Sequence, residues 1–271
     1  MLSNFIEIVG ITDPGSVRQF NEDNVVYDPD DGVMVLADGM GGHRAGEVAS
    51  RMATEIIIER LRTSVAEFGS SGDQHLPQLA VKQSINRAND AVFEAAEANP
   101  AYHGMGTTLV LAVFYDNRVT LAHVGDSRIY RLRNGRLELL TRDDSLLREQ
   151  IELGMISAAD ARGSHNRNLV TRALGIEKQV SAHVREDEAL PGDVFLLCSD
   201  GLNDLVEDAD IELIMNALNS NLPLAAQHLV QLAKDNGGSD NVSVILAKVR
   251  KPFPAATRGT SIDRLLGWLL R

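Results

Sequence analysis

The sequence has one cysteine, a shortage of positive charge and no long apolar run, and each shortage excludes a class of protein. The single Cys198 cannot form an intramolecular disulfide, and because it follows the apolar run Val194–Leu197 we expect a buried thiol. No apolar stretch approaches the ~20 residues of a membrane-spanning helix. Residues 1–10 lack the basic start and apolar core of a signal peptide. We therefore expect a cytoplasmic protein without a transmembrane segment.

The charge balance argues against a protein that binds nucleic acid or anionic membranes. The chain has 26 Lys and Arg against 38 Asp and Glu, a net charge of −12 at pH 7. Binding to nucleic acid or to an anionic membrane needs clustered Lys and Arg, so neither is expected as a partner. With 271 residues and 44% hydrophobic content, the chain can form one large packed domain or two small ones.

Short apolar or alternating segments between Gly, Asp and Asn predict a chain rich in β-strands. The predicted strands are Glu7–Thr12, Asn24–Tyr27, Val33–Ala37, Thr107–Tyr115, Val119–Val124, Arg128–Arg133, Val180–Val184, Val194–Cys198 and Val242–Val249. Helical spacing predicts helices at Gly46–Thr63, Leu76–Ala98, Ile211–Leu218 and Leu222–Lys234. Strands joined by tight turns, such as Asp116-Asn117 and Asn134-Gly135, with helices in separate blocks, indicate an α+β fold around antiparallel sheets.

Two segments differ from this pattern. Residues 141–172 are polar and lie between strands, which suggests a flap inserted into the domain. Residues 250–271 form a linker and a short amphipathic tail, with Ile262, Leu265, Leu266 and Leu269 on one helical face. We expect this tail to dock on its own domain, to bind a partner or to lie on a membrane surface.

Aspartates stand at the ends of the predicted strands. Asp38-Gly39 and Asp200-Gly201 each follow an apolar run, and Asp240 precedes the last strand. If the last strand runs antiparallel to the other two, the three carboxylates meet at one edge. Asp126 lies in a turn between two strands, and Glu22-Asp23 precedes another, so up to six acids would converge.

Converging carboxylates repel one another, and each costs several kcal/mol when it is buried unpaired. The pattern therefore reflects either a wrong strand assignment or a site for hard cations such as Mg²⁺ or Mn²⁺. Gly39 allows a sharp turn and offers its carbonyl as a further oxygen ligand. Taken singly, each Asp-Gly pair is more often a turn.

Six motifs, in order, resemble those of the PP2C-type (PPM) metal-dependent protein phosphatases, most closely the bacterial branch. They are Arg18-Gln-Phe-Asn-Glu-Asp-Asn24, Ala37-Asp-Gly-Met-Gly-Gly-His43, Gly106-Thr-Thr108, Val124-Gly-Asp-Ser-Arg128, Ser199-Asp-Gly-Leu202 and Ser239-Asp-Asn241. The resemblance covers residues 5–249 and implies a phosphatase domain at 1–249, an α+β fold with a central antiparallel β-sandwich flanked by helices on both faces.

The resemblance also implies a dinuclear Mn²⁺ or Mg²⁺ centre. In it Asp38 bridges both ions, the Gly39 carbonyl binds one, and Asp200 and Asp240 hold the other. Glu22 and Asp23 match acids that bind the ions or their waters, and Asp126 matches a ligand of a third, weaker ion. Arg18 matches the arginine that binds the substrate phosphate.

The chain departs from the family at several positions. Animal members have a histidine, proposed as general acid, where this chain has Met40; His43 is nearby and its role is open. Bacterial members often read Asp-His-Ser where this chain has Asp143-Asp144-Ser145. We expect the histidines without metal-ligand spacing to be structural or surface residues: His75, His103, His123, His183 and His228.

The resemblance implies hydrolysis of phosphoserine and phosphothreonine in proteins, opposing a partner Ser/Thr kinase. Two alternatives stay open at this point. One is a weakly active or inactive phosphoprotein-binding module of the same fold. The other is a two-metal enzyme that acts on small phosphoesters or nucleic acid, although the sequence shows no basic groove for the latter.

Overall fold

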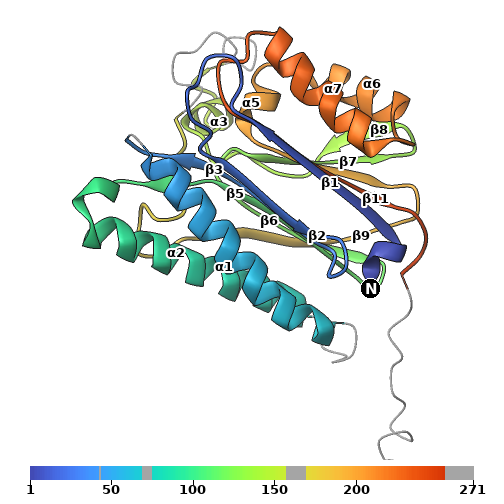
Figure 1. The fold of residues 1–271 in the computed structure, drawn as a ribbon, viewed down its shortest axis with the longest axis horizontal. Helices are drawn as coiled ribbons and strands as arrows, with labels where there is room; N and C mark the ends of the chain where they lie inside the picture. The colour runs from blue at the N-terminus through green and yellow to red at the C-terminus, as the bar shows by residue number, and fades with distance from the viewer. Residues whose placement is uncertain (43, 69–74, 157–168, 254–271) are drawn as a thin grey trace, which may run out of the picture.

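Two antiparallel β-sheets pack against each other at the centre of the molecule (Figure 1). The computed structural model describes residues 1–42, 44–68, 75–156 and 169–253. The 5-stranded sheet has the order β1-β11-β10-β7-β8, formed by β1 (Ile6–Asp13), β7 (Arg128–Arg133), β8 (Arg136–Leu139), β10 (Val194–Cys198) and β11 (Val242–Val249). The 6-stranded sheet has the order β2-β3-β5-β6-β9, with β4 paired to β3; its strands are β2 (Asp23–Asp28), β3 (Val33–Met40), β4 (Gly106–Thr107), β5 (Leu109–Tyr115), β6 (Arg118–Val124) and β9 (His183–Glu188).

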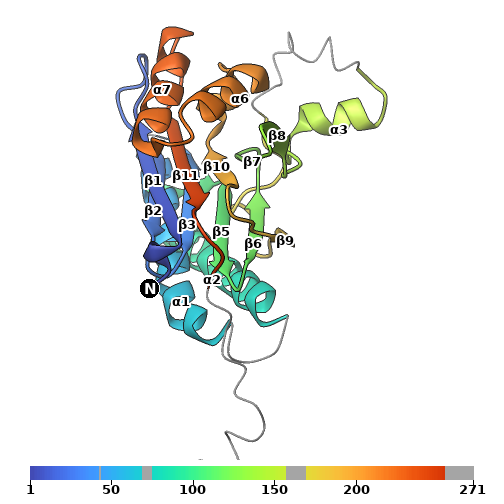
Figure 2. The same ribbon diagram turned by 90° about the vertical axis from the view of Figure 1, so that its right-hand side faces the viewer.

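Helices cover the outer face of each sheet (Figures 1 and 2). The 6-stranded sheet is covered by α1 (Ala45–Phe68) and α2 (Leu76–Ala98), and the 5-stranded sheet by α6 (Asp208–Ala217) and α7 (Leu222–Asp235). The shorter elements are η1 (Leu2–Asn4), η2 (Pro100–Tyr102), α3 (Leu146–Glu152) and α5 (Asp200–Asn203). The predicted α+β sandwich with helices on both faces is confirmed.

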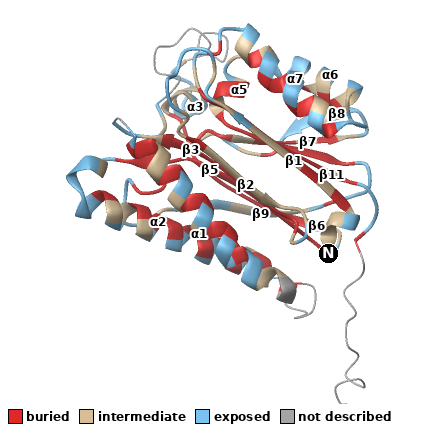
Figure 3. Cartoon of the chain, in the orientation of Figure 1, coloured by how far each residue is buried: buried red, intermediate tan, exposed pale blue. Residues whose placement is uncertain are grey.

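The apolar strands are buried on both faces, which explains why they are continuous apolar runs. In β3, Val33 and Val35 pack under α1 and α2, while Met34 and Leu36 point between the sheets. The central strands are accordingly buried along their length and the solvent-facing sides of the helices are exposed (Figure 3). Because both faces of the sandwich are filled with apolar side chains, polar groups gather at its ends.

Several elements match their predicted bounds, namely α2, β7, β10 and β11. The predicted hairpin turns also form, with positive φ at Asp116, Asn117, Asn134 and Gly135. Other assignments need correction. Helix α1 continues to Phe68, strand β3 continues to Met40 and so contains Asp38, and helix α6 begins at Asp208 instead of Ile211. The predicted strand Thr107–Tyr115 is divided into β4 and β5, β8 was not predicted, and β9 spans His183–Glu188 instead of Val180–Val184.

Some predictions fall partly outside the described residues. The flap contains α3, but residues 157–168 lie outside them, as does the tail from residue 254 onwards. Among the helices that the structure describes, none has the length and apolarity needed to cross a bilayer.

Candidate metal centre

The strand topology brings the predicted acids to one end of the sandwich, where α5 lies (Figure 1). Strands β10 and β11 are antiparallel neighbours, so Asp200 after β10 lies beside Asp240 before β11. In the other sheet, Asp23 of β2 pairs in register with Asp38 of β3. Asp126 lies in the turn that leads from β6 of one sheet to β7 of the other. The antiparallel direction that the sequence left open is therefore the one that gathers the carboxylates.

The charges of these acids act on one another. The pKa of Asp38 is raised well above its ordinary value, first by loss of hydration and then by the charges of Asp23, Asp200, Asp126 and Asp240. Loss of hydration also raises the pKa of Asp200 strongly, followed by the charges of Asp126, Asp204, Asp240 and Asp23. Five of the acids predicted from the sequence thus lie within electrostatic reach of one another.

The pKa values of Asp23, Asp126 and Glu22 are raised as well. Burial raises the pKa of Asp23 to about 6, although hydrogen bonds from Ser243 and Ser199 oppose the shift. Burial, followed by the charge of Asp143, raises the pKa of Asp126 to about 7. The pKa of Glu22 is raised by burial too, and the charge of Arg18 opposes this rise. Without a cation, these carboxyl groups therefore keep their protons to a higher pH than exposed carboxyl groups do.

Carboxylate oxygens at this end lack partners. Glu22 Oε1, Asp23 Oδ1 and Asp200 Oδ1 are buried and accept no hydrogen bond from the described residues. Such oxygens are costly unless a cation or water satisfies them. A set of carboxylates with free oxygens fits the hard divalent cations Mg²⁺ and Mn²⁺. The residues present therefore fit a metal centre of the predicted kind.

A close backbone approach explains Gly39. A Cβ atom built there would lie 2.1 Å from the carbonyl oxygen of Gly46 and 2.6 Å from that of Glu22. The Gly39 N–H donates to the Glu22 carbonyl at 3.1 Å. Glycine at this position therefore lets β3, the residues before β2 and the start of α1 meet beside Asp38.

Arg18 lies beside the acidic cluster. Its Nη2 is 2.8 Å from Asp240 Oδ2, and its side chain is 51% exposed. The guanidinium thus has donors on the solvent side of the site, while its contact with Asp240 fixes its place. This position suits a group that receives an anion from solvent.

Sequence reasoning missed the residues that hold the acids in place. Ser199 donates to Asp23 Oδ2 at 2.8 Å, and Thr108 Oγ1 accepts from the Asp38 N–H at 3.1 Å. Asn241 accepts from the Glu22 N–H and donates to the carbonyls of Pro14 and Phe20. Asp204 adds its charge to the cluster. Ser199, Thr108 and Asn241 stand inside the quoted motifs, next to the acids, and that adjacency is the signal for them.

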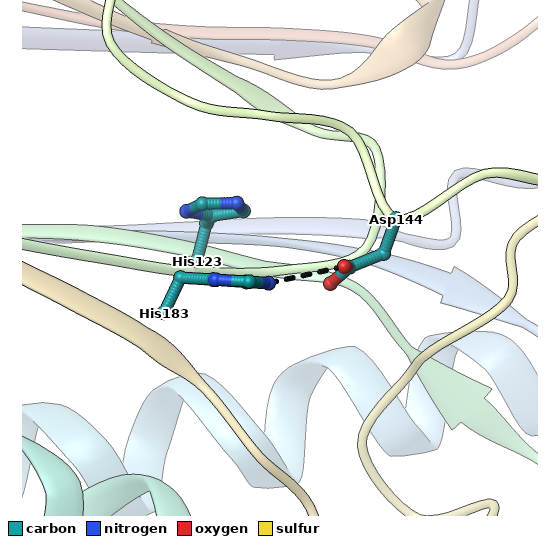
Figure 4. Close-up of side chains that lie close together, drawn as sticks. All are labelled: His123, Asp144 and His183. Atoms are coloured by element: carbon teal, nitrogen blue, oxygen red, sulfur yellow. Dashed lines mark hydrogen bonds and ion pairs between the residues drawn. The ribbon is translucent and has the colours of Figure 1, made fainter. Parts of the chain in front are cut away.

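The residues near the predicted general acid are only partly described. Met40 ends β3, whereas His43 lies outside the described residues. His123 and His183, expected to be structural or surface residues, lie close together with Asp144 (Figure 4). No sequence spacing predicts this second cluster, because its members come from three distant segments.

Comparison with known proteins agrees with the fold and shows the family. The family model described as Protein phosphatase 2C matches residues 16–234. The serine/threonine phosphatase stp of Listeria welshimeri is 37% identical over 240 residues, covering 88% of this chain and 93% of that protein.

Solved structures give the same result. Stp1 from Staphylococcus aureus has a TM-score of 0.81 and 34% identity, covering 90% of this chain and 95% of that one. The catalytic domain of PstP in complex with two manganese ions has a TM-score of 0.79 and 36% identity, covering 91% and 99%. The chain belongs to the protein phosphatase 2C family. It is a metal-dependent serine/threonine protein phosphatase of the bacterial type.

Proposed function

We propose that the acidic end of the sandwich is a dinuclear Mn²⁺ or Mg²⁺ centre with a third, weaker site. Asp38 would bridge the two ions, Gly39 would offer its carbonyl to one of them, and Asp200 and Asp240 would hold the other. Glu22 and Asp23 would bind the ions or their waters, and Asp126 would serve the third ion. The convergence of carboxylates with unpartnered oxygens carries this proposal.

Divalent ions bound there would supply a water of lowered pKa and positive charge for the phosphoryl oxygens. The chain's own contribution to substrate binding is Arg18. Its planar guanidinium can bind two phosphate oxygens at once, which an ammonium group cannot do in the same fixed geometry. Because half of the side chain is solvent-exposed, Arg18 can take a phosphate from solution while the acids behind it stay in place.

Met40 cannot be the general acid that protonates the leaving group, because a thioether has no proton to give. A protein substrate also needs space beside the centre, and the segment 141–172 is the part of the chain that would shape it. We propose that this flap sets substrate choice and that the acids set the chemistry.

The cellular setting is part of the same proposal. We propose that residues 1–249 are the catalytic unit, that 250–271 are an appended linker and tail, and that the protein acts in the cytoplasm on phosphoproteins made by a partner Ser/Thr kinase. The buried free thiol of Cys198 is compatible with a reducing compartment. The net charge of −12 is no obstacle, since bound cations would offset it locally.

Phosphate release from a phosphothreonine peptide tests this function. We expect no release with EDTA, release after addition of Mn²⁺, and loss of release in Asp240→Ala. If folded wild-type protein releases no phosphate with Mn²⁺ or Mg²⁺, the chain is instead a phosphoprotein-binding module. Faster hydrolysis of nucleotides than of phosphopeptides would favour a small-molecule phosphoesterase.

A further inference from the structure

A second cluster of metal-ligand side chains lies on the 6-stranded sheet and shares no residue with the proposed acidic centre. His123 comes from β6, His183 from β9 and Asp144 from the segment before α3 (Figure 4). One ligand-type atom from each lies within 4.8 Å of the others. Three elements distant in sequence thus present two imidazoles and one carboxylate to a single place.

A cation of the protein already occupies this place. Nη1 of Arg172 lies 2.7 Å from Asp144 Oδ1 and 3.0 Å from His183 Nε2, which are themselves 3.1 Å apart. The guanidinium therefore bridges an anionic oxygen and a ring nitrogen, the two kinds of atom that a metal ion would bridge. The Arg172 side chain is 40% exposed, so it can leave for solvent.

His123 is suited to act as a neutral ligand. Burial lowers its pKa, so the imidazole is uncharged at neutral pH, as a metal ligand must be. Its Nε2 lies 2.9 Å from the Arg142 carbonyl oxygen. This contact orients the ring, as hydrogen bonds to carbonyl groups do for histidines that bind metals. In a neutral imidazole that donates to the carbonyl, the other ring nitrogen keeps its lone pair.

The two rings need one adjustment to share an ion. Their ring centroids are 4.6 Å apart and the ring planes differ by 14°, so the rings are stacked. The lone pairs of their nitrogens therefore lie in nearly parallel planes. One ring must turn before both nitrogens point at the same ion. His183 is the ring that can turn, because its side chain is 42% exposed on an edge strand.

Solvent reaches the cluster through a cavity. A cavity of about 320 Å³ is lined by His123 and His183 together with Leu121, Ile129, Leu140, Thr141, Arg142, Val184 and Arg185. It is large enough for an ion to enter with its waters, which complete the coordination that three protein ligands leave open.

We propose that His123, Asp144 and His183 form a site for one transition-metal ion, with Zn²⁺ as the preferred ion. This ion competes with the guanidinium of Arg172. Two imidazoles and a carboxylate suit Zn²⁺, whereas the oxygen-only centre at the other cluster suits Mg²⁺ and Mn²⁺. The two clusters would therefore select different metals within one chain. Zn²⁺ binding would also release Arg172 from Asp144 and His183, and the ion would take over the link between the flap segment and β9.

The test is a calorimetric titration of the full chain with Zn²⁺ in millimolar Mg²⁺, which measures the affinity for Zn²⁺. Co²⁺ serves as a second probe, because a site with two imidazoles and low coordination number gives stronger visible absorption than an oxygen-only site. We expect His183→Ala and Asp144→Asn to weaken binding by about 10-fold or more. Every variant keeps the acidic centre, so binding there is common to all of them.

Arg172→Ala gives the sharper result, because it removes the competing cation and leaves all three ligands. We expect Zn²⁺ to bind about two- to fivefold more tightly in this variant, the range that an exposed ion pair accounts for. Arg185→Ala is the control, since it also removes one arginine charge near the cluster, but Arg185 lines the cavity and pairs with Asp187 and not with the ligands. An affinity for Zn²⁺ that is unchanged in His183→Ala, or no tighter in Arg172→Ala than in Arg185→Ala, would overturn the proposal.

Discussion

Asp23 and Asp144 have the same exposed fraction, 8%, but the protein treats their charges in opposite ways. Asp144 receives Arg172 and the Gly125 N–H on its two oxygens. Asp23 faces other carboxylates, has no arginine partner among the described residues, and has one oxygen that accepts nothing. Burial alone therefore does not mark a site for hard divalent cations. An uncompensated buried charge does mark such a site, because a fold keeps such a charge where a bound cation balances it.

The largest expected effect comes from removing Asp38, whose pKa burial and the neighbouring acids raise well above its ordinary value. Asp38→Ala should lower turnover of a phosphothreonine peptide by about 10³-fold or more, because the centre would lose the carboxylate that we propose to bridge both ions. Steady-state kinetics in Mn²⁺ measures this. Asp30→Ala, an exposed acid that bonds Ser3, is the control and should keep full activity. A folded Asp38→Ala protein with normal turnover would remove the distinction between the two kinds of buried acid.

A smaller effect is expected from Arg18, and the chain provides a matched control. Arg18–Asp240 and Arg62–Asp28 are both 2.8 Å ion pairs, and the arginine side chains are 51% and 47% exposed. We expect Arg18→Ala to raise KM for a phosphopeptide by about 10- to 100-fold, since it removes hydrogen bonds to a charged group. Arg62→Ala should leave KM unchanged. Equal KM values in the two variants would exclude phosphate binding by Arg18.

The stability of the metal-free protein should depend on pH through the acids of the acidic centre. The pKa of Asp23 rises from 3.8 to about 6 and that of Asp126 from 3.8 to about 7, so the folded state holds more protons than the unfolded state between these values. Stability of the metal-free protein must then fall as pH rises through this window. We expect Tm in EDTA to drop by about 5 °C or more between pH 5 and pH 7.5.

Mn²⁺ should reverse most of this loss, because the cation stabilises the ionised carboxylates. Asp38→Asn should flatten the pH dependence in EDTA, as it removes a neighbouring negative charge. A Tm in EDTA that rises over the same pH range would contradict the assignment of raised pKa values to these acids.

The smallest effect concerns a residue that supports the cluster. Ser199→Ala removes the hydroxyl that donates to Asp23 at 2.8 Å and accepts from the Ser243 N–H at 3.0 Å. We expect unfolding free energy to fall by about 1–2 kcal/mol in denaturant titrations with EDTA. Ser64→Ala, whose hydroxyl bonds only within exposed α1, is the control. A loss no larger than that of the control would show that Asp23 needs no donor from Ser199.

Part of this architecture was predictable because strands buried on both faces leave an unmistakable pattern. The bounds of β10 and β11 follow from their apolar runs, and the strand-end aspartates follow from those bounds. The pairing of β10 with β11 was not predictable, because strand direction depends on the distant packing of both sheets. The resemblance supplied residue roles that spacing alone could not.

Two of the wrongly assigned strands, β8 and β9, are edge strands. Strand β8 is mostly exposed and charged at alternate positions, and β9 reads His-Val-Arg-Glu-Asp-Glu. Neither sequence looks apolar, whereas Val180 and Ala182, which looked like strand residues, pack instead against the cluster under α1 and α2. The second cluster was unpredictable for a related reason, since its histidines approach each other only through the pairing of β6 with β9 at His123 and His183.

The origin of the acids has a mechanical consequence. Asp23 and Asp38 belong to one sheet, Asp200 and Asp240 flank strands of the other, and Asp126 lies on the chain that crosses between them. Ions held by this set would link the two layers at one end, in addition to the hydrogen bonds that join Ser199 to Asp23 and Asn241 to the Glu22 N–H. Sliding of one sheet over the other would then have to break coordination bonds, so the rigidity of the whole sandwich would depend on the supply of divalent metal.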